Sequence, residues 1–231
     1  MPGSFGYAIW LLASTLELTV VVCALRRHCF GRYFCLNLYM LSSLLVSIAR
    51  YEALSHFGFH SRQYLYCFYY SDAVLTIFLY LALITLYLHV FDEMKVEKYL
   101  RIAALILLVG TALFSYAVVQ QSSQRMVTSF VYELSQNLYF VGLVLTYVLW
   151  GAILKLRETR TQLVQLVLSL GVYFSAYAAT FALGNMFPNL QSIADICPVF
   201  GCMLPLAWAY AFMRLSPDDR MATARLAVVP R

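Results

Sequence analysis

Residues 64–90 read YLYCFYYSDAVLTIFLYLALITLYLHV, and Asp72 is the single Asp, Glu, Lys or Arg among them. A continuous apolar run of about 18 or more residues predicts a transmembrane helix, because about 20 residues span a hydrocarbon core of about 30 Å. The whole chain has the same character, since 62% of its 231 residues are hydrophobic and 12% are charged. Soluble domains carry about 25% charged residues. The composition therefore predicts an integral membrane protein.

Six further apolar runs flank this segment, and short charged joints separate them. Together they predict an all-α bundle of seven transmembrane helices, which forms a single domain over residues 1–214. A short cytoplasmic tail follows over residues 215–231. At about 20 residues per crossing, we expect no separate soluble domain. The predicted spans are 7–25, 33–50, 64–90, 100–120, 128–154, 163–185 and 192–214.

The basic residues are divided unevenly between alternate joints. The first, third and fifth joints and the tail hold thirteen of the sixteen Lys and Arg residues, whereas Arg50, Arg62 and Arg125 occupy the other joints. Cytoplasmic joints carry the excess of Lys and Arg. We therefore expect the N-terminus outside, the C-terminus in the cytoplasm, and a multi-pass protein of the cytoplasmic (inner) membrane. Because the joints account for the net charge of +5, the expected partner is the lipid bilayer and not a nucleic acid.

Four acidic residues fall inside the predicted spans. The predicted topology places Asp72, Glu133 and Asp195 at a similar depth, a few residues below the outer surface, and Glu17 nearer the middle. A carboxylate at the centre of a span costs on the order of 3 kcal/mol on insertion scales, so such acids normally face the bundle interior or water. The four acids therefore predict a binding site in the outer half of the bundle.

Polar residues recur near these acids at helical spacing. Asn137 follows Glu133 by four residues, and Tyr173 and Tyr177 are four apart on the sixth span, so each pair shares a helix face. The pattern predicts an outward-facing polar and acidic cavity for a small-molecule or cation ligand, an amine or a proton relay. The alternative is that each acid is protonated or hydrogen-bonded and only fixes helix packing. A similar stripe on the second span consists of Tyr39, Ser43 and Ser47.

A second group of candidate ligands lies in the segment YEALSHFGFH. Glu52, His56 and His60 follow one another at four-residue intervals. If the second helix continued past Arg50, these side chains would share one face and could bind a divalent metal, with Asp72 as a fourth ligand. The alternative is an outer loop with solvated histidines, which we consider the better interpretation.

Several cofactors and reactions have no support in the sequence. A retinal Schiff base is excluded because it needs a lysine inside a span, and Lys95, Lys98 and Lys155 all lie in cytoplasmic joints. The chain has no GxSxG motif and no phosphate-binding glycine loop, so we assign no catalytic residue and do not favour an enzyme.

Three functions fit the pattern. The favoured one is a sensor or receptor-like module that binds a ligand or cation and acts through a separate cytoplasmic or membrane protein, because the tail is short. The first alternative is a small secondary transporter or an ion or proton pathway that uses the same acids. The second alternative is a metal-dependent intramembrane enzyme. One-sided binding is favoured because the spans have no acidic or basic residue between Glu17 and the cytoplasmic joints.

Overall fold

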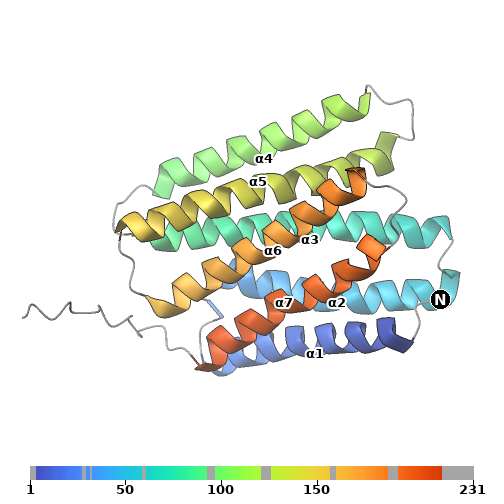
Figure 1. Ribbon diagram of the computed structural model, residues 1–231, viewed down its shortest axis with the longest axis horizontal. Coiled ribbons are helices and arrows are strands. Elements are labelled where there is room, and N and C mark those ends of the chain that lie inside the picture. The colour runs from blue at the N-terminus through green and yellow to red at the C-terminus, as the bar shows by residue number, and fades with distance from the viewer. Residues whose placement is uncertain are drawn as a thin grey trace, which may run out of the picture.

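The computed structural model describes residues 4–27, 30–31, 33–58, 61–92, 97–120, 126–156, 160–186 and 192–214. Within these ranges the chain forms an all-α bundle of seven helices that run alternately up and down (Figure 1). Each helix coincides with one predicted apolar run. The helices are α1 (Ser4–Arg26), α2 (Phe34–Phe57), α3 (Arg62–Val90), α4 (Glu97–Gln120), α5 (Met126–Leu156), α6 (Thr161–Met186) and α7 (Ser192–Arg214).

The lengths and composition of the helices fit a membrane-type bundle. Helices α1 to α6 are each long and apolar enough to cross a membrane. In α7 the side chains are described from Val199 onward, and Val199–Arg214 is a shorter apolar stretch. These findings confirm the predicted all-α membrane-like architecture. The seventh crossing and the orientation stay predictions from the charge pattern.

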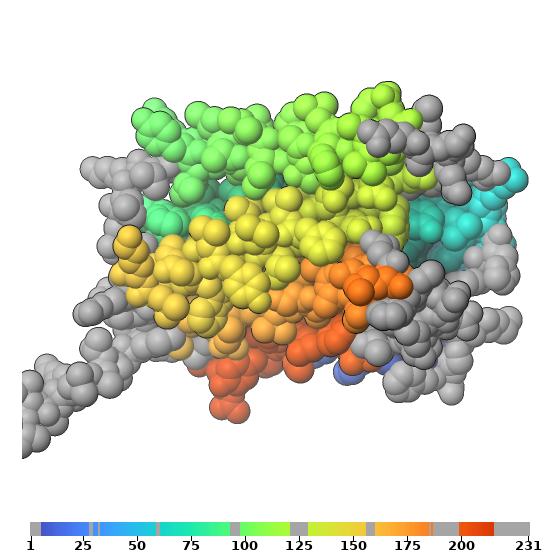
Figure 2. Space-filling view, turned by 45° about the horizontal axis from the view of Figure 1, so that its top comes forward, coloured from blue at the N-terminus to red at the C-terminus, as the bar shows by residue number. Residues whose placement is uncertain are grey.

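Six helices close a ring around the core, and α4 lies outside it. Helix α1 packs between α2 and α7, α6 packs between α5 and α7, and α3 joins α2 to α5. Helix α4 packs mainly on α5 and stands at the rim of the bundle, as Figures 1 and 2 show. The ring interior is filled by large side chains, among which Trp208, Phe174 and Phe212 are almost fully buried.

Helix α2 extends seven residues beyond the predicted span of 33–50. It ends at Phe57, where Gly58 has a φ of 76° and donates its N–H to the carbonyl of Leu54. Glycine adopts a positive φ without the steric cost of a Cβ atom, so it readily ends a helix. The expectation that the segment after Arg50 is an outer loop is therefore wrong: residues 51–57 are helical.

A glycine brings α5 and α6 close together. A Cβ atom added to Gly142 of α5 would lie 2.3 Å from Cε1 of Phe174 on α6. Nearby, a Cβ atom on Gly171 of α6 would lie 2.9 Å from Cγ2 of Thr146 on α5. The two helices therefore approach each other at two small residues, and this approach places Tyr139 of α5 against Tyr177 of α6 at a ring-centroid distance of 4.9 Å.

Candidate functional site

Glu17 is an acidic side chain buried inside the bundle, with an exposed fraction of 7%. It lies on the face of α1 that carries Val20 and Ala24, both fully buried, so the helical period directs the carboxylate inward. Its Oε1 accepts a hydrogen bond of 2.5 Å from Oγ of Ser43 on α2. Its Oε2 is buried and has no hydrogen-bond partner among the described residues. A buried polar atom without a hydrogen-bond partner destabilises the fold by about 1–3 kcal/mol. A hydrogen-bond donor placed at Oε2 would remove this cost.

Further polar groups surround Glu17. The hydroxyl of Ser14, about one turn away on α1, is buried and also lacks a hydrogen-bond partner in the described ranges. Tyr39 and Arg50 of α2 lie within electrostatic range of the carboxylate, as does Cys202 of α7. Glu17 therefore occupies the place where α1, α2 and α7 meet.

Arg50 fixes the C-terminal part of α2 to the N-terminal part of α3. Its Nη2 lies 3.9 Å from Oδ1 of Asp72 and donates a hydrogen bond of 3.1 Å to the carbonyl of Phe68. Its Nε donates a hydrogen bond of 2.8 Å to Oγ of Ser71. The guanidinium also lies 4.3 Å from the centroid of the Phe68 ring, a cation–π geometry. Asp72 therefore has a positive partner, and the half of the bundle that holds it is not purely acidic.

A cluster of tyrosines occupies the interior between α2, α5 and α6. The ring centroids of Tyr173 and Tyr177 are 4.5 Å apart, and Tyr139 stacks on Tyr177. Tyr39 lies close enough to Tyr173 for a side-chain hydrogen bond. Tyr39 and Tyr139 both lie within electrostatic range of Asp72. The cluster therefore connects the acids of α1 and α3 to α5 and α6 through aromatic rings and hydroxyl groups.

The predicted stripe on α5 does not face this cluster. Nδ2 of Asn137 donates a hydrogen bond of 3.0 Å to Oγ of Ser115 on α4, so Asn137 faces α4, and its part in ligand binding stays a prediction. Glu133 lies one turn away on the same face, is half-buried, and forms no hydrogen bond or ion pair with a described residue. The interior face of α5 instead presents Ser135, which lies beside Asp72, and Tyr139.

Sequence reasoning missed Ser135 and Tyr139, although they are four residues apart and share a helix face. A signal for that face does exist, because Leu138, Gly142 and Thr146 continue it at three- and four-residue intervals. Small and apolar residues at that spacing indicate close helix packing. The neighbouring stripe of Glu133 and Asn137 carries an acid and an amide, which are more polar, so it indicated a binding site more strongly than the face of Ser135 and Tyr139.

Two other predicted groups are only partly described. Asp195 lies in α7, but its side chain is outside the described part of the structure, and so is His60. Glu52 and His56 are exposed at the C-terminal end of α2, and the His56 ring tilts against Phe57 at a centroid distance of 6.5 Å. Among the described residues, no group of three or more His, Cys, Asp and Glu could hold a metal ion. The metal set of Glu52, His56 and His60 stays a prediction.

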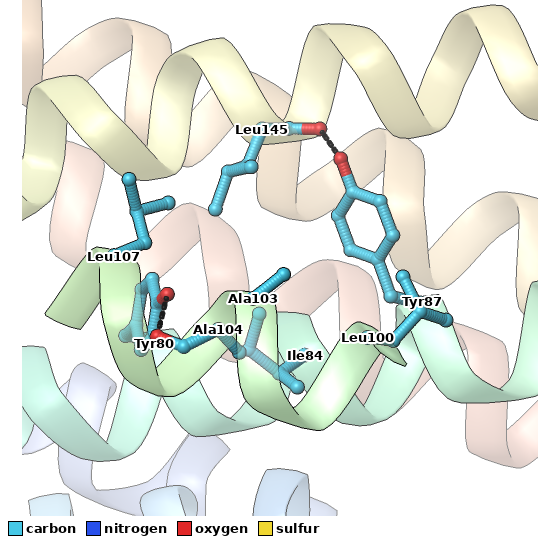
Figure 3. A pocket seen from close by; sticks show the side chains of 8 residues that line it. All are labelled: Tyr80, Ile84, Tyr87, Leu100, Ala103, Ala104, Leu107 and Leu145. Atoms are coloured by element: carbon cyan, nitrogen blue, oxygen red, sulfur yellow. Dashed lines mark hydrogen bonds between the residues drawn. The ribbon is translucent and has the colours of Figure 1, made fainter. Parts of the chain in front are cut away.

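Two cavities in the described part of the bundle lie away from the buried acids. A small apolar cavity of about 80 Å³ lies between α3, α4 and α5 (Figure 3). Two tyrosine hydroxyls close it, since Tyr80 donates a hydrogen bond of 2.8 Å to the carbonyl of Ala104 and Tyr87 donates one to the carbonyl of Leu145. A larger hollow of about 670 Å³ lies between α4 and α5, beside Asn137. Neither has an acidic or basic side chain in its lining.

The candidate site therefore consists of three groups, which we call the polar cluster. Its members are Glu17 with Ser43, Arg50 with Asp72, and the tyrosines Tyr39, Tyr139, Tyr173 and Tyr177. The cluster is drawn from α1, α2, α3, α5 and α6.

Comparison of the chain with family models, curated proteins and solved structures finds no match.

Proposed function

We propose that this protein is a sensor or receptor-like module of the cytoplasmic membrane that binds a small amine or monovalent cation at Glu17. The observation that carries the proposal is the second oxygen of the buried Glu17 carboxylate, which has no hydrogen-bond partner among the described residues. An ionised carboxylate only accepts hydrogen bonds, and an ammonium group only donates them. A protonated amine would therefore supply both the missing donor and the compensating charge.

The surrounding charges favour a monovalent ligand. Asp72 is already paired with Arg50 at 3.9 Å, which leaves Glu17 as the unbalanced acid of the polar cluster. A calcium ion takes six to eight oxygen ligands, whereas Glu17 offers one free carboxylate oxygen. Aromatic faces attract ammonium groups, and Tyr39 lies within electrostatic range of Glu17.

The proposed orientation follows the charge pattern of the joints. With seven spans and the N-terminus outside, the Arg50–Asp72 pair lies nearer the outer surface than Glu17. Arg50 follows Ser43 by seven residues, about two helical turns along the same face of α2. A ligand arriving from outside would thus pass the ion pair before it reaches Glu17. The response would pass to a separate protein, which would bind the basic cytoplasmic joints.

A thermal-shift measurement on the full-length protein in lipid nanodiscs tests this proposal. The probes are methylamine, longer primary amines, quaternary amines, and the ions Na⁺ and K⁺. A ligand at a hundred times its dissociation constant stabilises by about 2.7 kcal/mol. We expect at least one amine or monovalent ion to raise the unfolding temperature of the wild type. Glu17→Gln, which keeps the size and removes the charge, should abolish the shift.

A matched variant controls for a general effect of removing an acid. Glu52 is exposed at the end of α2, so Glu52→Gln should keep the whole ligand-induced shift. An equal shift in wild type and Glu17→Gln would contradict the proposal. So would the lack of any shift in the wild type with all the probes.

A second candidate function is an ion or proton pathway. It is favoured by buried polar atoms of Asn37, Gln162 and Trp208, which have no hydrogen-bond partner among the described residues. They lie in the half of the bundle predicted to be cytoplasmic. The spans there have no acidic or basic residue along which a proton or an ion could move. A flux assay in proteoliposomes distinguishes the two functions. Proton or amine movement that is lost in Asp72→Asn supports the pathway, and binding without flux supports the sensor.

A further inference from the structure

The hollow between α4 and α5 is large enough to hold a ligand. Its volume is about 670 Å³, and ligand pockets commonly measure about 300–1,000 Å³. The described residues that line it all come from these two helices, and two of them, Ile106 and Phe114, are 64% and 60% exposed. Figure 2 shows α4 and α5 side by side at one face of the molecule. The hollow therefore opens to the surroundings of the bundle, which for a membrane-type bundle are lipid.

Most of the lining is apolar, and it is elongated. Along α4 it extends from Ala103 to Phe114, a distance of about 17 Å at 1.5 Å per residue. Helix α5 contributes Phe140 and Val141. A Cβ atom added to Gly110, in the middle of the lining, would meet nothing within 4 Å, so this glycine leaves the hollow open. Its shape and chemistry suit a hydrocarbon chain.

Two polar side chains, Thr111 and Asn137, interrupt this apolar lining. The Thr111 hydroxyl donates a hydrogen bond of 2.7 Å to the carbonyl of Leu107, so its hydrogen is used within α4. Asn137 donates from Nδ2 to Oγ of Ser115. A side-chain amide has two donor hydrogens and one acceptor oxygen, and Asn137 forms no other hydrogen bond with a described residue. Its acceptor Oδ1 is therefore available at the hollow.

Asn137 lies close to one surface of the membrane. Its partner Ser115 is five residues, or about 8 Å, from the end of α4 at Gln120. The 24 residues of α4 span about 36 Å, compared with a hydrocarbon core of about 30 Å. With α4 centred on the core, Asn137 is thus just inside the hydrocarbon boundary, and the apolar lining extends from there past the middle of the membrane. A membrane lipid has its polar and apolar parts in the same order.

We propose that the hollow binds a neutral long-chain lipid whose polar end is a hydroxyl group. The hydroxyl donates its hydrogen to Oδ1 of Asn137, and the hydrocarbon chain lies along Gly110 between the two helices. The hydroxyl carries no charge, so it enters a lining that has no acidic or basic side chain without an unpaired charge.

Other polar ends match the hollow less well. A carboxylate only accepts hydrogen bonds, so it cannot bind Oδ1, and Glu133, one turn from Asn137 toward the membrane surface, would repel it. An ammonium group at Asn137 would place a charge in a lining without an acid. A plain hydrocarbon would fill the hollow and leave Oδ1 without a donor. The site uses α4, which has no part in the polar cluster, so it is independent of the ligand proposed at Glu17.

A photoreactive dodecanol, with a diazirine at the far end of its chain, tests the site in the full-length protein. The protein is held in phosphatidylcholine nanodiscs, and mass spectrometry locates the label. We expect label on the lining of the hollow that excess dodecanol removes. Dodecane, which lacks the hydroxyl, should compete about two- to tenfold less well, as the loss of one uncharged hydrogen bond requires. Dodecanoic acid and dodecylamine should also compete less well than dodecanol.

Variants locate the bound lipid. Asn137→Leu should weaken the binding of dodecanol about two- to tenfold. Gly110→Leu places a side chain in the open space of the hollow and should abolish the competed label. The matched control Gly151→Leu, at another glycine whose added Cβ atom meets nothing within 4 Å, should keep it. Glu17→Gln should also keep it, because the two sites are separate.

Four results would overturn the proposal. Equal competition by dodecane and dodecanol would show an ordinary lipid contact only, and stronger competition by the acid or the amine would show a different polar end. Label that persists in Gly110→Leu would place the lipid outside the hollow. A wild-type dimer that Gly110→Leu converts to a monomer would show that a second copy of the chain covers this face. Should Asn137→Leu not fold, the competitor series in the wild type and Gly110→Leu still decide.

Discussion

Substitution of Gly142 by alanine should destabilise the bundle through the contact between α5 and α6. The added Cβ atom would lie 2.3, 2.6 and 2.7 Å from three ring carbons of Phe174, whereas ordinary van der Waals contact begins near 3.4 Å. Phe174 is 1% exposed and packs in the core, so the ring has no free space to enter. Overpacking of this kind costs about 1–3 kcal/mol, and alanine recovers about 0.5–1 kcal/mol of helix propensity. The two terms combine to a net loss of up to about 2.5 kcal/mol.

Gly151 is the matched control on the same helix. A Cβ atom there would meet nothing within 4 Å, so Gly151→Ala should stabilise by about 0.5–1 kcal/mol. Unfolding of both variants in mixed detergent micelles, followed by circular dichroism over an SDS titration, measures the difference. If Gly142→Ala is as stable as Gly151→Ala, the close approach of α5 and α6 is wrong, and so is the placement of Tyr139 against α6.

Three further predictions concern the polar cluster and the orientation. Ser43→Ala removes the hydrogen bond to the buried Glu17 and should lower the free energy of unfolding by about 1–3 kcal/mol in the same titration; an unchanged stability would refute that contact. A double-mutant cycle of Arg50→Gln and Asp72→Asn should give a coupling energy below about 1 kcal/mol, because the ion pair is partly exposed. A coupling energy above about 2 kcal/mol would show that the pair is not partly exposed to solvent. Lys155, exposed near the end of α5, should react with a membrane-impermeant amine reagent in inside-out vesicles and not in right-side-out ones; the reverse pattern would refute the orientation.

The positions of the helices could be predicted well from the sequence, because each apolar run is long and the joints are charged. The run at residues 64–90 corresponds to α3 at Arg62–Val90, and residues 163–185 correspond to α6 at Thr161–Met186. The end of α2 was placed too early because hydropathy falls at the first charge, Arg50. The helix continues to Gly58, since backbone conformation and not polarity ends it.

The site was harder to predict, because a polar stripe shows which residues share a face but not which neighbour they face. Helix α5 packs against α3, α4 and α6, and the stripe of Glu133 and Asn137 turns toward α4. Glu17 is buried in the bundle, as the cost of exposing a carboxylate to lipid requires. Its contact with Ser43 and the pairing of Arg50 with Asp72 depend on the packing of separate helices, which local spacing does not determine.

The central claim is that the free oxygen of Glu17 accepts a hydrogen bond from a bound amine or coordinates a bound monovalent cation. The most direct test is the dissociation constant of the probe that stabilises the wild type most, measured by calorimetry in nanodiscs for wild type and Glu17→Gln. A hydrogen bond to a charged group is worth about 1.5–3 kcal/mol, so the dissociation constant should rise about 10- to 100-fold in Glu17→Gln. An unchanged dissociation constant would contradict the claim.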